Sequence, residues 1–237
     1  MKKTKWMMMG ALLIAGMVQA ALVTLDENTP TKVANWYAAE VGVAGGTPTG
    51  AATSGVGNNT NVSSLVVGMV KNASSTNLSR GGFDFDVSGQ QTVTNATLNL
   101  YLSGKISPSY ALAVYAKTVN VTLNTNNTLP RAAFSDSNYV DTGLRLATTS
   151  ASGWYTFDVT SYITNSVANG GNVSFRFQML NDTTLTFGTA NSYTISSFKT
   201  TATAPSLNLY TIPEPATIGM LGLGTIITLL IRKRSNS

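Results

Sequence analysis

The chain has no cysteine and no histidine among its 237 residues. Without cysteine it can form neither a disulfide nor a thiol nucleophile. Without histidine it lacks the base of a Ser-His-Asp triad, the usual ligands of a structural zinc ion and a side chain that titrates near neutral pH. Apolar residues make up 43% of the chain, so a folded domain of this size must depend on its hydrophobic core.

Charge is also scarce. Charged residues are 11% of the sequence, against about 25% in an average globular domain. Six of the fifteen basic residues lie at the two ends, at positions 2, 3, 5 and 232–234, which leaves nine between 21 and 211; ten acidic residues less Glu214 also leave nine. Because the middle of the chain carries no excess positive charge, we exclude nucleic-acid binding.

The first twenty residues have the layout of an export signal. MKKTKWMMMGALLIAGMVQA begins with lysines and continues with an apolar stretch from Trp6 to Val18. The small residues Val18 and Ala20 flank Gln19 as a signal peptidase requires. We therefore predict a signal peptide over 1–20, passage through the Sec translocon and cleavage before Ala21.

The last 26 residues, 212–237, form a second terminal signal. Ala216 to Ile231 is an uncharged run that would extend about 24 Å as a helix, somewhat less than the hydrocarbon core of about 30 Å. Arg232, Lys233 and Arg234 follow it, and such a cluster stays on the cytoplasmic side. The sequence thus predicts a short transmembrane helix.

Pro213, Glu214 and Pro215 stand directly before this run. In this order, with the apolar run and the basic cluster, they resemble the PEP-CTERM sorting signal of exopolysaccharide-producing Gram-negative bacteria. The resemblance implies an exosortase that removes the tail near the prolines and releases the protein to the cell surface or extracellular matrix. Membrane contact would then be transient; an ordinary tail anchor is the alternative.

Between the two ends, apolar and polar residues alternate in many short runs. Alternation of this kind is typical of half-buried strands, and Gly, Asn, Ser and Pro separate the runs. The runs lie at 83–87, 96–102, 112–116, 119–123, 155–159, 173–179 and 207–209. They predict an all-β fold, a single jelly-roll-like antiparallel β-sandwich over 21–211. A short helix is expected after Asp158, capped by Thr160 or Ser161, and a long loop over 42–61.

Several segments of this body resemble DNRLRE domains. They are SSLVVG (63–68), SRGGFDFDVS (79–88), TVTNATLNLYL (92–102), GWYTFDVTSYITNSVANGGNVSFRF (153–177) and APSLNLY (204–210). DNRLRE domains are jelly-roll β-sandwiches, and some are similar to carbohydrate-binding modules that act on matrix polysaccharides. The resemblance implies the same architecture here.

Asp84 and Asp86 are two residues apart on one strand, so both point to the same face. Paired carboxylates serve glycosidases, but those pairs usually flank a cleft from different elements. With Phe83 and Phe85 inward, we expect the two aspartates on a solvated face, with calcium as a candidate ligand and no catalytic role. We expect no other cofactor.

Trp36, Tyr37 and Trp154 are the aromatic residues best suited to stack on a sugar ring. Alternation places Trp154 on the side opposite Phe157 and Val159, hence outward; the alternative is that Trp154 caps the end of the core.

Three functions remain open. The first is a non-enzymatic adhesive or structural protein of the exopolysaccharide matrix, the second a polysaccharide-binding module, and the third a histidine-free lyase or hydrolase.

Overall fold

The structure is a computed structural model that describes residues 20–57, 63–71, 76–90, 92–123, 129–188 and 190–212. The predicted signal peptide, up to Gln19, and the predicted sorting tail, from Pro213 onward, lie outside these residues. Within them, no helix combines the length and the apolar character that a membrane crossing needs.

Strands make up most of the described chain, and every strand pair is antiparallel. Their bounds are β1 (Ala21–Leu25), β2 (Val33–Gly42), β3 (Ser54–Gly57), β4 (Ser64–Lys71), β5 (Thr76–Asp86), β6 (Thr92–Ile106), β7 (Leu112–Lys117), β8 (Val140–Leu146), β9 (Gly153–Asp158), β10 (Asn172–Met179), β11 (Asn191–Ser196) and β12 (Ser206–Ile212). The helices are α1 (Leu129–Ser135) and α2 (Thr160–Ala168), with 3₁₀ turns η1 (Asp182–Thr184) and η2 (Thr201–Thr203).

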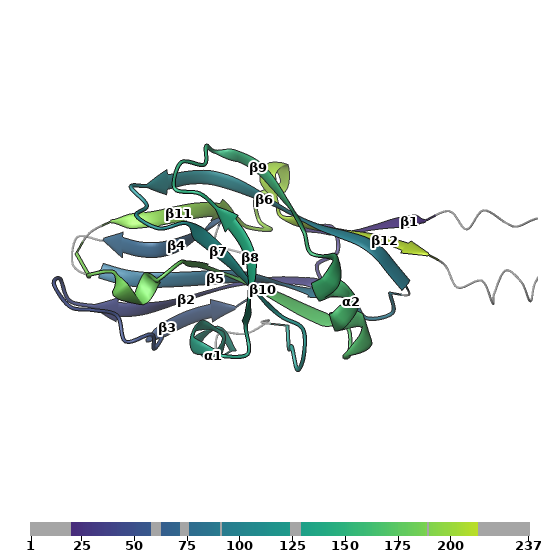
Figure 1. The fold of residues 1–237 in the computed structure, drawn as a ribbon, viewed down its shortest axis with the longest axis horizontal. Helices are drawn as coiled ribbons and strands as arrows, with labels where there is room; N and C mark the ends of the chain where they lie inside the picture. Colours follow the sequence, from purple (N-terminus) through teal and green to yellow (C-terminus); the bar gives the residue numbers. More distant parts are fainter. Residues whose placement is uncertain are drawn as a thin grey trace, which may run out of the picture.

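The strands form two packed layers that are joined along one edge. One layer contains β1, β12, β6, β9, β11 and β4; the other contains β3, β2, β5, β10, β7 and β8. The join lies at β5, which pairs with β4 over Thr76–Ser79 and with β10 over Gly81–Asp86. This arrangement confirms the predicted antiparallel β-sandwich (Figure 1).

The main core lies between the layers. The residues that alternation places inward on β5, β6, β10 and β12 are all buried there. Phe83 contacts Phe177 edge to face with ring centroids 5.4 Å apart, and Phe85 contacts Phe175 at 6.2 Å. Burial of so many large apolar side chains stabilises this domain without the disulfides that smaller exported domains use.

A second, smaller core lies on the outer face of the β2–β5–β10 layer. Helix α1 covers this face, and its own Phe134 is buried there together with Trp36 and Tyr139. Gly82 is required here, because a Cβ at this position would come within 2.4 Å of the Trp36 ring. Strand β2 is therefore buried on both faces and shows no alternation in its sequence.

Two local expectations have different outcomes. The helix after Asp158 is confirmed as α2, and the chain leaves it at Asn169, just before Gly170 and Gly171. Its expected cap is wrong, because Val159 occupies the N-cap position and Asp158 Oδ1, not Thr160 or Ser161, accepts from a backbone amide of the first turn, that of Thr160.

The strand expected over 119–123 is also wrong. Asn120 adopts a left-handed backbone conformation, with φ of 53°, which ends the extended run after β7. The loop expected over 42–61 is shorter than predicted, since β3 pairs with β2.

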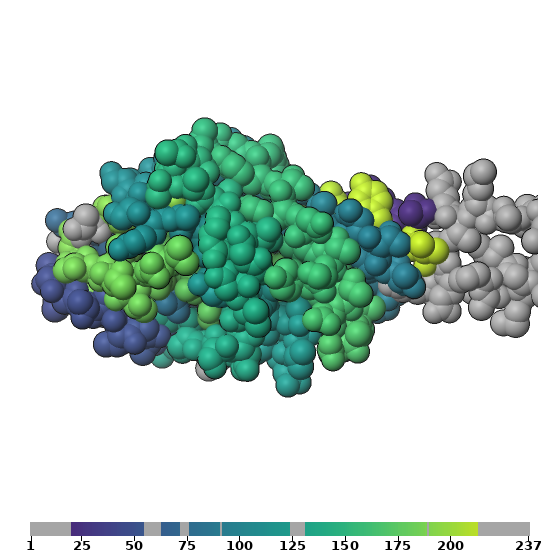
Figure 2. Space-filling model, in the orientation of Figure 1, coloured from purple at the N-terminus to yellow at the C-terminus, as the bar shows by residue number. Residues whose placement is uncertain are grey.

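The first and last strands lie side by side and lead both ends of the described chain to one pole. Ala21 pairs with Thr211, and Leu25 pairs with Leu207. β1 and β12 project from the body at the right-hand end of Figure 1, and the space-filling view shows the molecule narrowing there (Figure 2).

Candidate functional site

The most exposed large aromatic side chain of the described residues is Trp154, at the start of β9. Its side chain is 52% exposed, whereas Phe157 on the same strand is buried in the main core. Among the described strands β9 pairs only with β6, and Tyr101 of β6 lies directly opposite Trp154. The alternation along β9 thus turns Trp154 outward, as the sequence predicts, and contradicts a role as a core cap.

Tyr101 fixes the orientation of the Trp154 ring. The two ring centroids are 5.4 Å apart and the planes are inclined at 72°, an edge-to-face contact. Tyr101 is half-buried, so it supports the indole from one side and leaves the other side open to solvent. From sequence alone Tyr101 ranks below Trp36, Tyr37 and Trp154 as a residue that could stack on a sugar, although the inward Leu100 and Leu102 on either side of it place it outward.

Polar side chains continue the surface away from this aromatic pair. Thr156 donates a hydrogen bond to Asn99 Oδ1 at 2.8 Å, and Asn99 Nδ2 donates to Ser206 Oγ at 3.1 Å. In the next row Thr97 faces Asp158 on β9 and Asn208 on β12. Hydroxyl and amide groups that are fixed by their neighbours can both donate to and accept from a bound polyol. We call Trp154, Tyr101 and these two rows the aromatic platform.

Trp36 and Tyr37 do not contribute to this surface. Trp36 is completely buried, and its Nε1 donates a hydrogen bond to Asp84 Oδ1 at 3.1 Å. The prediction that Trp36 could stack on a sugar is wrong, because neither face of its ring is free. Tyr37 packs against the main core and its hydroxyl hydrogen-bonds Ser79 Oγ at 2.8 Å.

Asp84 and Asp86 point to the same face of β5, but that face is not solvated at Asp84. Asp84 is completely buried under α1, where it accepts hydrogen bonds from Trp36 and from Ser174 Oγ. Asp86 is half-buried and forms an ion pair with Lys32 Nζ at 2.8 Å. Protein donors therefore occupy both carboxylates, and the expected solvated face is wrong for Asp84. A calcium ion at this pair stays a prediction with no geometric support.

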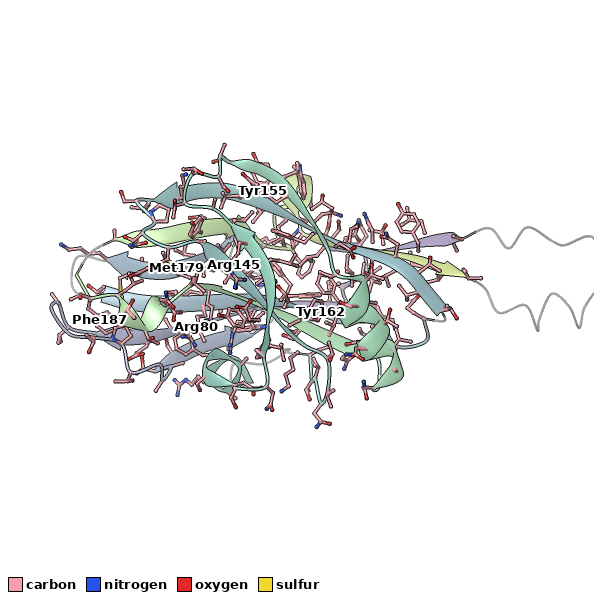
Figure 3. All side chains as sticks on the ribbon, in the orientation of Figure 1. Arg80, Arg145, Tyr155, Tyr162, Met179 and Phe187 are labelled. Atoms are coloured by element: carbon pink, nitrogen blue, oxygen red, sulfur yellow. The ribbon has the colours of Figure 1, made fainter. Side chains whose placement is uncertain are left out.

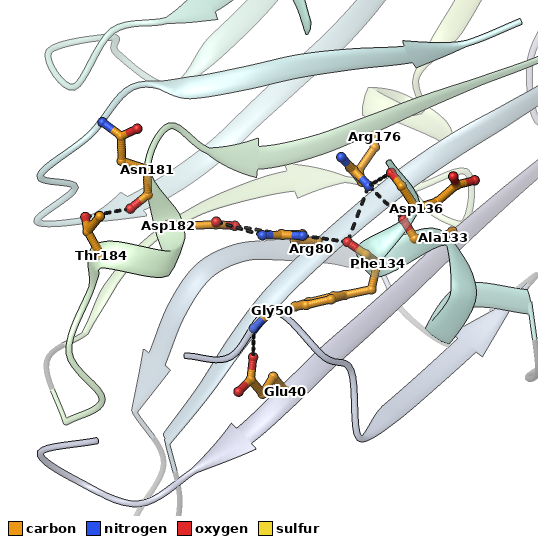
Figure 4. A network of polar contacts seen from close by, with 10 residues as sticks. All are labelled: Glu40, Gly50, Arg80, Ala133, Phe134, Asp136, Arg176, Asn181, Asp182 and Thr184. Atoms are coloured by element: carbon orange, nitrogen blue, oxygen red, sulfur yellow. Dashed lines mark hydrogen bonds and ion pairs between the residues drawn. The ribbon is translucent and has the colours of Figure 1, made fainter. Parts of the chain in front are cut away.

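A network of buried charges surrounds the C-terminal end of α1 (Figure 4). Arg80 makes two hydrogen bonds to Asp182, from Nε at 2.7 Å and from Nη2 at 2.8 Å, and its Nη1 donates to the Phe134 carbonyl. Arg176 Nη1 donates to the carbonyls of Ala133 and Asp136 at 3.0 Å. Two cations thus satisfy the open carbonyl groups of the last helical turn.

Burial and the neighbouring Arg80 lower the pKa of Arg176 to about 10, which still leaves it charged at neutral pH. Arg176 also lies over the Tyr139 ring, 4.4 Å from its centroid. Burial, together with the nearby Asp84, raises the pKa of Tyr139, which stays neutral. These groups are buried, and their contacts hold the helix on the sheet.

In the described part of the chain, no three acidic side chains gather closely enough to hold a metal ion. The platform presents an exposed indole and fixed polar side chains on one sheet face. All polar groups of the platform except Asp158 are uncharged, so the platform suits a flat, hydroxyl-bearing ligand.

Comparison with known proteins identifies two regions of the chain. Residues 211–235 match the PEP-CTERM protein-sorting motif, so the chain carries that motif at its C-terminus as predicted. Residues 52–211 match the model of carbohydrate-binding module family 96. The DNRLRE resemblance implied the same architecture and stays a prediction. A search of curated proteins finds no match.

Among solved structures, the chain is similar to a family 35 carbohydrate binding module from Clostridium thermocellum at 12% identity, over 81% of this chain and 99% of that one. The TM-score is 0.27, too low for the likeness to bear on fold or function. The family 96 match, in contrast, spans more than half of the sequence and contains every strand from β3 to β11 and nearly all of β12. On that match, the chain belongs to carbohydrate-binding module family 96.

Proposed function

We propose that this protein is exported, sorted by its C-terminal motif, and binds a polysaccharide outside the cell through the aromatic platform. The observation that carries the proposal is the family match over the same residues that hold an exposed tryptophan on a polar sheet face. Of the functions that the sequence leaves open, the match favours the polysaccharide-binding module over a purely structural matrix protein.

The platform would bind a sugar in two ways. The open face of the Trp154 indole would stack on the apolar face of a pyranose ring. Asn99, Thr156 and the row behind them would exchange hydrogen bonds with its hydroxyl groups. One ring and a few neutral hydrogen bonds support weak binding, with a dissociation constant on the order of 1 mM, or about −4 kcal/mol.

No catalytic step belongs to this proposal. Carbohydrate-binding modules as a class hold polysaccharide without cleaving it, and the candidate carboxylates Asp84 and Asp86 are engaged by protein donors. The sorting motif implies processing by an exosortase, and we assign the released protein to the cell surface or exopolysaccharide matrix of a Gram-negative bacterium. There its role would be adhesive.

The full-length chain in detergent, applied to an array of polysaccharides, tests the proposal. The wild type should bind at least one of them, and Trp154→Ala should reduce that binding at least tenfold with little change in melting temperature. Tyr155→Phe is the matched control, because Tyr155 lies inward next to Trp154. If Trp154→Ala instead lowers the melting temperature as a core mutation would, or if Tyr155→Phe loses as much binding, the platform is not the site. An array without any binding would contradict the function itself.

A further inference from the structure

A groove lies along the open edge of the sandwich, between β8 and β9. In the described residues β8 pairs only with β7 and β9 only with β6, so these two edge strands leave the sandwich unclosed on this side. Helix α2 follows β9 directly and forms the floor of one end. Tyr162, labelled on α2 in Figure 3, lies in the middle of this region.

Three hollows follow one another along this edge. The first, of about 480 Å³, lies between Asp158, Leu144 and Tyr162. Tyr162 also lines the second, of about 400 Å³. Lys117 and Asn120 line both the second hollow and the third, of about 140 Å³. Because adjacent hollows share wall residues, the three are neighbours along this edge, and we call them together the α2 groove.

The second hollow combines apolar walls with amides that have no protein partner. Val119 and Val140 line it and are 48% and 62% exposed. The side-chain amides of Asn120 and Asn165 also line it, and neither makes a hydrogen bond within the described residues. An aromatic ring, aliphatic rims and unoccupied amides suit a sugar unit, whose rings are apolar and whose edges carry hydroxyl groups.

Contacts within the protein hold the walls of the groove in place. Lys117 Nζ pairs with Asp136 Oδ2 at 2.7 Å, and Asn172 Nδ2 donates to the Val121 carbonyl at 3.0 Å. On the other side, Ile163 anchors α2 in the main core. A preformed groove binds without the cost of ordering its walls.

The charges of the groove favour a neutral ligand. Lys117 is neutralised by Asp136, and the remaining charge, Asp158, is acidic. Asp158 Oδ1 accepts from the Thr160 backbone amide at 2.9 Å and from its hydroxyl at 2.6 Å, while Oδ2 makes no hydrogen bond within the described residues. The free oxygen can accept from a sugar hydroxyl, whereas a uronate would be repelled.

Asp158 connects the groove to the aromatic platform. It points outward on β9 on the same face as Trp154, four residues and about 13 Å along the strand, and it also lines the first hollow. A single extended chain can therefore lie on Trp154, cross the Thr156 row and continue past Asp158 onto Tyr162.

We propose that the platform and the α2 groove form one extended site for an internal stretch of a neutral polysaccharide chain. The inference rests on the proposed function and adds its substrate class: a long, uncharged chain rather than a chain end or a single sugar. Contacts along successive units add to the affinity, so binding strengthens with chain length until the groove is filled.

The test uses an array of neutral gluco-, xylo-, manno- and galacto-oligosaccharides, each from disaccharide to octasaccharide, with uronic-acid oligosaccharides beside them. For the best-bound neutral series, we expect the affinity of the full-length wild type to rise at least tenfold between trisaccharide and octasaccharide. Trp154→Ala should weaken binding at every length. Tyr162→Ala should remove the gain with length and leave the trisaccharide unchanged.

Asn165→Ala is a second groove variant, which tests the groove even if Tyr162→Ala does not fold. It should fold, because Asn165 is exposed on α2 and alanine favours helix. It should lower octasaccharide affinity threefold to tenfold. Thr164→Ala, one position away on the exposed side of α2, is the matched control and should leave it unchanged.

A wild-type affinity that stops rising at the trisaccharide, or groove variants that bind octasaccharide as Thr164→Ala does, would overturn the extended site while the proposed function stands. Binding of uronic-acid chains alone would overturn the neutral class. If no oligosaccharide binds at any length, the proposed function fails together with the inference.

Discussion

The buried ion pair between Arg80 and Asp182 gives the sharpest test of how α1 is held on the sheet. Both side chains are almost fully enclosed, at 8% and 3% exposure, and two hydrogen bonds connect them. Asp182→Ala would leave the Arg80 guanidinium buried with the Phe134 carbonyl and ring as its main contacts. Because a buried charge without its partner is costly, we expect this variant to lose about 3–5 kcal/mol of unfolding free energy.

The structure supports that magnitude independently. Each lost bond is charge-assisted and contributes roughly 1.5–3 kcal/mol. A domain of this kind has about 5–15 kcal/mol in total, so the variant should remain folded but unfold at clearly lower urea concentration. The measurement is urea unfolding of residues 21–212, monitored by circular dichroism.

The double variant Arg80→Met/Asp182→Leu separates loss of the charge partner from loss of packing. Replacing both charges by apolar side chains is often neutral, so the double variant should recover most of the stability. The Phe134 carbonyl would still accept from Arg176 Nη1, at 3.3 Å. If Asp182→Ala costs less than about 1 kcal/mol, or the double variant is no more stable than the single one, the pair is not what holds α1 in place.

Two further predictions concern pH and processing. Burial raises the pKa of Asp136, but the Lys117 and Asn138 hydrogen bonds outweigh it, so its folded pKa lies below the usual 3.8. A lowered folded pKa gives stability that is present above the unfolded value of about 3.9 and lost as pH falls through the folded one. The free energy of unfolding, measured with urea, should therefore vary little between about pH 7 and 5 and fall below about pH 4. The fall should be smaller in Asp136→Asn. A decrease in the unfolding free energy between pH 6 and 5 would contradict this. Mass spectrometry of the released protein should find its C-terminus near Pro213, and recovery of intact Ser237 outside the cell would refute sorting by the motif.

The parts of the fold that alternation predicted are those with one buried face. β6, β9 and β12 have the core on one side and solvent on the other, so their sequences alternate and Trp154 was correctly placed outward. β2 was missed because α1 covers its second face, so both faces are buried and the sequence does not alternate. For the same reason Asp84 and Trp36, whose residue types favoured a solvated or ligand-binding role, are buried against each other.

The groove could not be predicted, because it depends on which edges are left unpaired. Nothing in the sequence near Tyr162 or Asn165 indicates that β8 and β9 are the edge strands of the two layers and lie next to each other. The run Val119–Leu123 alternates as a strand would, yet Asn120 turns the chain and makes this segment a wall of the groove. Alternation in the sequence indicates which face of a single strand is buried, whereas a groove depends on how several strands and helices pack together.

The topology also separates Trp154 from the end of the domain that leads to the sorting motif. β12 ends at Ile212, one residue before the Pro-Glu-Pro, and its last pairs with β6 are at Val93 and Thr92. Tyr101, which supports Trp154, lies nine residues further along β6, about 30 Å at the usual rise of a strand. Trp154 and Tyr101 are therefore the part of the platform farthest from the end of β12, whereas Asn208 in its second row lies four residues, about 13 Å, from Ile212. On the proposed function, Trp154 would be open to a ligand both before and after removal of the tail, so cleavage would change the location of the protein and not the ligand that it binds.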